Sequence, residues 1–135
     1  MKKLFLSLLF AASLGLTGCG LEGSMSSGAM KNSLNSAGYN QVEVMSRVEA
    51  TARIEGITWN VDITDALYCD QNKEAILAFF CSNINDAEKF VKENIAVMVR
   101  FAEKYSEDPK TGQHNNVAYC GSPKILKAAG IPIGG

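Results

Sequence analysis

Most signatures of catalytic chemistry are missing from this 135-residue chain. It contains no GxSxG motif, no glycine-rich phosphate-binding loop and no CxxC spacing. Its single histidine, His114, lies beside Asn115 and Asn116, in a stretch typical of a solvated turn. A catalytic histidine needs a positioned nucleophile and an orienting group, and the sequence indicates neither. We therefore predict a protein that is not an enzyme and that holds no metal or other cofactor.

An excess of positive charge and a long apolar run are also missing. The chain has 13 basic and 14 acidic residues, and without residues 1–18, which carry two lysines and no acid, the balance is 11 to 14, a net charge of −3. Nucleic-acid binding calls for a basic patch, so we expect no nucleic-acid partner. The longest apolar run, residues 4–16, is shorter than the roughly 20 residues that span a bilayer.

What the chain does have is an N-terminal secretory signal. Lys2 and Lys3 precede the apolar run, which identifies residues 1–18 as a signal peptide. The run ends in Leu16-Thr17-Gly18-Cys19, which resembles the lipobox of bacterial lipoproteins. That resemblance implies cleavage before Cys19 and its acylation, and Gly20 in place of an aspartate implies the outer membrane, facing the periplasm. A soluble secreted protein with a chance cysteine near the cleavage point is the alternative.

The mature chain divides into three predicted segments. Residues 19–40 contain the lipidated cysteine and a stretch rich in Gly, Ser and Asn, which predicts a flexible tether with a reach of about 25 Å. Residues 41–120 carry periodic patterns and are the predicted domain. Residues 121–135 form a C-terminal tail in which we expect at most one helical turn.

Alternation of apolar and polar residues predicts two strands at the start of the domain. Apolar or small residues occupy the even positions of residues 42–54, which favours a strand, although Val44, Val48 and Ala52 would also share a helical face. Glu55 and Gly56 then predict a turn into a second strand, residues 57–63, with Trp59 in the core. The polar positions of the first strand form a mixed-charge stripe, read as a solvated sheet face or a recognition surface: Glu43, Arg47, Glu49, Arg53 and Glu55.

The rest of the domain predicts helix and then strand. An apolar stripe favours a helix from Thr64 or Asp65 to about Cys81, followed by a short second helix over residues 86–93. Alternation predicts a third strand at 95–102, and a turn at 108–112 leads to a fourth strand at 113–120. The predicted fold is α+β, a four-stranded antiparallel sheet in the order ββαββ with a broken helix packed on one face.

Three cysteines remain after the anchor: Cys69, Cys81 and Cys120. Export to an oxidising compartment favours one disulfide bond. Cys69 and Cys81 would lie roughly 18 Å apart along one helix, beyond bridging distance. Cys81 closes the predicted helix and Cys120 the last strand, so we predict a Cys81–Cys120 bridge, with Cys69–Cys120 as the alternative.

The layout resembles a group of small lipoproteins, the ββαββ pilotins of type II secretion systems with one disulfide bond. The features shared with them are the lipobox, Ser36-Ala37-Gly38-Tyr39 before the first strand, Cys81 before a short helix, Val91-Lys92-Glu93-Asn94-Ile95 leading into a strand, Thr111-Gly112 in a hairpin and the closing Cys120. The resemblance implies a non-catalytic adaptor that binds a secretin subunit and carries it to the outer membrane. The alternative function is an inhibitor or shielding lipoprotein acting on a host or competitor protein such as a cell-wall hydrolase. We expect contacts with the bilayer through Cys19 and with a protein partner, and no small-molecule substrate.

Overall fold

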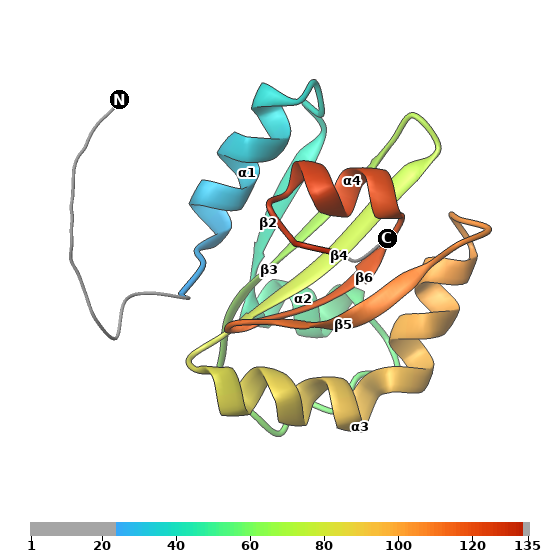
Figure 1. The fold of residues 1–135 in the computed structure, drawn as a ribbon. Helices are drawn as coiled ribbons and strands as arrows, with labels where there is room; N and C mark the ends of the chain where they lie inside the picture. The colour runs from blue at the N-terminus through green and yellow to red at the C-terminus, as the bar shows by residue number, and fades with distance from the viewer. Residues whose placement is uncertain (1–23, 134–135) are drawn as a thin grey trace.

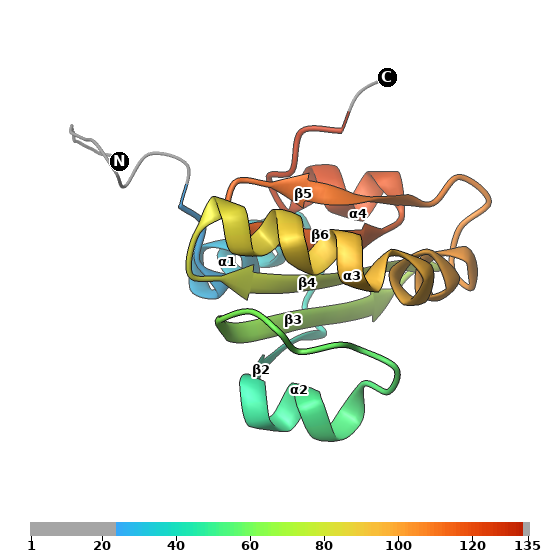
Figure 2. The same cartoon turned by 90° about the horizontal axis from the view of Figure 1, so that it is seen from below.

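The computed structural model describes residues 24–133, which form one antiparallel sheet covered by helices on both faces (Figures 1 and 2). The five strands are β2 (Val42–Ser46), β3 (Ile63–Gln71), β4 (Glu74–Cys81), β5 (Lys110–His114) and β6 (Val117–Gly121), and they lie in the order β2-β3-β4-β6-β5. The α+β class is therefore confirmed. The predicted number of four strands is wrong.

Each face of the sheet has its own helices and its own core. One core joins Phe79 of β4 to Phe90 and Met98 of α3 (Ile84–Glu103) and to Ala50 of α2 (Arg47–Arg53). The other core joins Phe80 of β4 to α1 (Ser27–Ser36) and α4 (Pro123–Ala128). Successive side chains of a strand point to opposite faces, so the adjacent phenylalanines of β4 serve different cores. We call these two sides the α3 face and the α1/α4 face.

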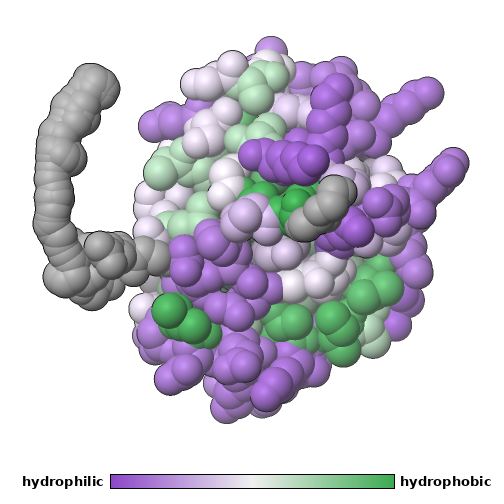
Figure 3. All heavy atoms as spheres, in the orientation of Figure 1, coloured by the Kyte–Doolittle hydropathy of each residue, from purple (hydrophilic) through white to green (hydrophobic). Residues whose placement is uncertain are grey.

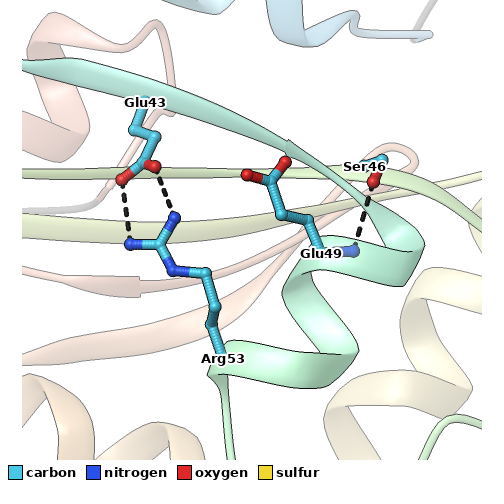
Figure 4. Close-up of polar contacts among 4 residues, drawn as sticks. All are labelled: Glu43, Ser46, Glu49 and Arg53. Carbon is cyan, nitrogen blue, oxygen red and sulfur yellow. Dashed lines mark hydrogen bonds and ion pairs between the residues drawn. The ribbon is translucent and has the colours of Figure 1, made fainter.

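The first predicted strand, residues 42–54, ends at Ser46 in the structure and continues as α2. Ser46 is the N-cap, and its hydroxyl accepts a hydrogen bond from the Glu49 amide at 3.1 Å (Figure 4). Ser-x-x-Glu is the capping-box pattern that begins helices. In the helix the even positions fall on opposite sides, so that Ala50 is buried whereas Val48 is 80% exposed. The predicted second strand is also wrong, because residues 57–62 form an irregular connection, although Trp59 does pack against Phe79 as expected of a core residue.

The predicted helix up to Cys81 is a β-hairpin. β3 and β4 are joined by Asn72 and Lys73, whose φ angles are 59° and 64°, as a two-residue type I′ turn requires. Residues 75–81 of β4 are all buried because both faces of the sheet are covered. Such a continuous apolar run does not distinguish a central strand from a helix, and the turn lacks the glycine that usually marks it.

The predicted short helix and third strand form a single helix, α3. Asn83 caps its start by accepting a hydrogen bond from the Asp86 amide at 2.8 Å. Its buried residues recur at helical spacing, namely Ala87, Phe90, Asn94, Met98 and Ala102. The alternation over residues 95–102 is thus a coincidence within a helix, and Ile95 on it is 44% exposed.

Helices near both limits of the described residues belong to the folded domain. The predicted tether contains α1, whose Met30 and Leu34 are buried under the sheet, and the predicted tail contains α4, which is longer than one turn. The predicted fourth strand is two strands, β5 and β6, joined at Asn115 and Asn116. The segment β3-β4-α3-β5-β6 does have the predicted ββαββ order, but it is built from other residues than those we assigned.

Candidate binding groove

A groove of about 580 Å³ opens on the α3 face, within the size range of ligand-binding pockets. We call it the α3 groove. It is lined by Met45, Arg53, Ile54, Glu55, Ile57, Tyr68, Leu77, Val97, Met98, Arg100, Phe101 and Lys104.

The floor of the α3 groove is apolar and comes from three adjacent strands. Met45 lies on β2, and Tyr68 of β3 is the register partner of Leu77 on β4. One wall is the C-terminal half of α3, with Val97 and Phe101. The opposite wall is the connection after α2. The groove exists because α2 has seven residues and α3 has twenty, so the two helices do not cover this face completely.

Side chains hold the connection after α2 in place. The buried Asn94 accepts from the Thr58 amide at 2.6 Å and donates to the Thr58 carbonyl at 3.1 Å. Arg47 donates to the carbonyls of Val61 and Trp59, each at 3.1 Å. Because every one of these contacts joins a side chain to the backbone, the wall is fixed independently of the side chains that it presents to the groove.

The charged groups of the groove are mainly cationic. Arg53 forms a two-pronged ion pair with Glu43 of β2, which lowers the pKa of Glu43 through the hydrogen bond from the guanidinium (Figure 4). Between residues 24 and 133 the ion pairs are Arg53–Glu43 and Lys110–Asp108. Arg100, in the last turn of α3, and Lys104, its C-cap residue, thus have no carboxylate partner in this part of the chain. Both complement the dipole at the end of α3.

Aromatic side chains close one end of the groove. The rings of Tyr68 and Phe101 meet edge to face with centroids 5.9 Å apart, and Phe101 and Tyr105 follow at 5.1 Å. The Tyr68 hydroxyl donates to Asp70 at 3.2 Å. Burial, and then the neighbouring Tyr105, raise the pKa of Tyr68. Tyr68 is therefore a neutral hydrogen-bonding group at physiological pH.

The sequence-predicted sites lie elsewhere. The signal peptide and Cys19 are outside the described residues. Cys69, Cys81 and Cys120 are buried free cysteines. Cys120 is the register partner of Leu77, four residues along β4 from Cys81, which corresponds to roughly 13 Å and exceeds bridging distance. Cys69 belongs to the core of the other face. The predicted Cys81–Cys120 bridge therefore does not form in this structure, and the register also separates the alternative pair.

His114 is the last residue of β5 and is half-buried, rather than being the fully solvated turn residue that we expected. Its Nε2 lies 3.2 Å from the Asn115 amide nitrogen. Among residues 24–133, no group of three or more His, Cys, Asp and Glu side chains is placed to hold a metal ion.

Sequence reasoning missed most of the groove. The predicted mixed-charge stripe supplies two lining residues, Arg53 and Glu55. Arg100 and Lys104 come together only once residues 84–103 are known to be one helix with Lys104 as its C-cap. The Ser46-x-x-Glu49 pattern was the available signal for α2; no comparable signal marks Tyr68 or Leu77, whose meeting depends on the hairpin register.

The chain matches no protein-family model, and no curated protein or solved structure is significantly similar to it. Within residues 24–133, no helix has both the length and the apolar character that crossing a bilayer requires.

Proposed function

We propose that this protein is an outer-membrane lipoprotein, anchored through acylated Cys19, whose periplasm-facing domain binds another envelope protein at the α3 groove. The proposed partner is a secretin subunit, and the proposed role is that of a pilotin-like assembly adaptor that acts by contact and not by turnover. The lipobox-like segment supports the anchor, and the resemblance to pilotins supports the choice of a secretin.

The observation that carries this proposal is the chemistry of the α3 groove. An apolar floor with aromatic side chains and an arginine-containing rim is typical of the centre of a protein–protein interface. Arg100 and Lys104 have no carboxylate partner in the described chain. A partner segment that combines apolar side chains with carboxylates would match both the floor and the rim.

The limits of the described residues lie on the face of the sheet away from the α3 groove. Met25 and Ile133, near the two limits of the described residues, both pack against the core of the α1/α4 face. The α3 groove opens on the other side of the sheet. A separate molecule is therefore the better occupant.

Capture of the secretin from cross-linked outer membranes tests this function. We expect the wild-type protein to recover the secretin and the R100E/K104E variant to lose it. The matched control is K31E/K124E, which makes the same change of charge with exposed lysines of α1 and α4 and should retain binding. Recovery of the secretin by neither form, together with normal secretin localisation in a deletion strain, would refute the pilotin-like role. Recovery of a host or competitor hydrolase in its place would favour the inhibitor alternative.

A further inference from the structure

Hydrogen bonds fix the point at which the N-terminal chain leaves the folded domain. Asn116, 8% exposed, accepts from the Met25 amide at 2.6 Å and donates to the Met25 carbonyl at 3.0 Å. The side-chain nitrogen of Asn116 also donates to the Cys81 carbonyl, at the end of β4, at 3.1 Å. Ser27, in the first turn of α1, donates to Asp65 at the start of β3. Met25 is therefore held at one end of the sheet.

Little chain separates this fixed point from the proposed lipid. Six residue steps lead from Cys19 to Met25, which span at most about 20 Å when fully extended. The 20 residues of α3 extend over about 30 Å. If the far end of α3 faced the bilayer, Met25 would stand farther from the lipid than this link can reach.

The end of the domain near Met25 presents an apolar side chain. The first turns of α1 and α3 lie at the same end of the sheet, on its opposite faces (Figures 1 and 2). Ile84 begins α3 and is 52% exposed, and green hydrophobic surface interrupts the purple along the lower part of the molecule, where α3 lies (Figure 3).

The acidic side chains at this end are engaged within the protein. Asp62 accepts from the Ser82 hydroxyl at 2.8 Å, Asp65 from the Thr64 hydroxyl at 2.8 Å, and Asp86 from the Asn83 amide at 3.3 Å. We call the region formed by Met25, residues 82–86 and the Asn115–Asn116 turn the exit end. Its hydrogen-bonded polar groups and its one exposed apolar side chain, Ile84, suit a zwitterionic lipid surface better than an anionic one.

We infer that the exit end lies against the lipid headgroups, with Ile84 in the interface, and that the C-terminal half of α3 with its groove points away from the membrane. This inference rests on the proposed anchor at Cys19 but not on the identity of the partner. Asn116 is the positioning residue, because it fixes where the link to the lipid begins.

Two exposed isoleucines of α3 provide a matched pair for the test. Ile84 and Ile95 are eleven residues apart, which places them on nearly the same face of the helix and about 16 Å apart along its axis. Trp59 is the only tryptophan of the chain. The acylated protein carrying W59F with either I84W or I95W is reconstituted into phosphatidylethanolamine–phosphatidylcholine vesicles, with a nitroxide on a fraction of the headgroups.

We expect the I84W form to be quenched several-fold more strongly than the I95W form. Inserting twelve Gly and Ser residues after Glu22, or making the N116A substitution, should reduce the difference in quenching between the I84W and I95W forms. If W59F disturbs folding, photo-cross-linking takes the place of fluorescence quenching. A photoreactive residue is placed at position 84 or 95 of the otherwise wild-type protein, and lipid adducts should form at position 84.

Equal quenching of the two forms in acylated, vesicle-bound protein, or stronger quenching of the I95W form, would overturn this inference and leave the proposed function standing. Mass spectrometry that finds Cys19 unacylated, with protein that does not float with the vesicles, would instead refute the anchor and with it both proposals. The secretin capture above is independent of the quenching result.

Discussion

The two faces of the sheet are covered by different parts of the chain and to different extents. The α1/α4 face is covered by segments from the two ends of the described chain, which bury Met30, Leu34, Ile125 and Leu126. The α3 face is covered by internal segments, and there a short helix and an irregular connection leave the α3 groove open. The ends of the domain thus contribute mainly to stability, whereas the internal segments build the surface that we propose for binding.

This difference changes the picture of how the protein is anchored. Residues 25–36 look like a polar tether because α1 contributes only Met30 and Leu34 to the core. Since these two side chains are buried, the fold that the structure describes already begins near Met25. If Cys19 carries the proposed lipid, only six residue steps separate it from Met25, and the domain is held closer to the lipid than a 20-residue tether would hold it.

The largest expected effect comes from the α1/α4 face. Leu34→Ala should lower the free energy of unfolding by about 2–5 kcal/mol, because it leaves a cavity at a side chain that is 0% exposed. Urea unfolding followed by circular dichroism measures this change. Asn35→Ala, an exposed neighbour in the same helix, is the control. An unchanged midpoint in the Leu34 variant would mean that residues 25–36 are a tether after all.

A smaller loss is expected at the groove wall. Asn94→Ala should cost about 1–3 kcal/mol, because the Thr58 amide and carbonyl lose their partner. Amide exchange over residues 55–62 should become faster while exchange in α1 is unchanged. Asn85→Ala, an exposed position on the same helix, should have neither effect. Unaltered exchange in the Asn94 variant would show that the wall is held by other contacts.

The buried thiols of the α3 face make stability depend on alkaline pH. Burial raises the pKa of Cys81 and of Cys120 from 9.0 to about 12. Between these values the unfolded chain loses the two protons and the folded chain keeps them, so the free energy of unfolding should fall as pH rises from 9 to 12. The C81A/C120A variant should show a shallower fall, measured by urea unfolding at each pH.

The same thiols offer a direct check of the register. Denatured, unreduced protein should show Cys69, Cys81 and Cys120 as alkylatable thiols by peptide mapping. A Cys81–Cys120 peptide would contradict the β4–β6 register, and in that case reduction should destabilise the fold by about 3–4 kcal/mol.

The smallest effect on stability is expected from the groove cations. Arg100 and Lys104 are exposed and have no ion pair within residues 24–133, so R100E/K104E should lower the free energy of unfolding by about 1 kcal/mol, through the reversed charges at the end of the helix dipole. Thermal unfolding measures this. A loss of several kcal/mol would mean that the substitutions disrupt the end of α3, and the loss of secretin capture by this variant would then no longer report on binding.

The fold class could be predicted from the sequence, but the assignment of most residues could not. Period-two alternation marks strands with one buried face, whereas the central strands here are buried on both faces, so β4 looks like a helix. The turn at Asn72 and Lys73 has no glycine to mark it, and α3 carries an accidental alternation over residues 95–102. The first error follows from the position of the sheet between two layers of helices, and the other two are local to the turn and to α3.

The α3 groove could not be predicted from the sequence either. Its floor depends on the pairing of Tyr68 with Leu77, and its cationic rim depends on the continuity of α3. Both are consequences of tertiary structure. The capping pattern at Ser46 and Glu49 is the exception, because it marks the start of α2 in the sequence itself.

Hydrogen–deuterium exchange of the protein, alone and with the proposed secretin partner, tests the contrast between the two faces most directly. The account predicts that α1 is protected already in the free protein, and that the partner adds protection at residues 54–58 and 97–104 and none on α1 or α4. Rapid exchange throughout residues 25–36 of the free protein, or new protection confined to the α1/α4 face, would contradict it.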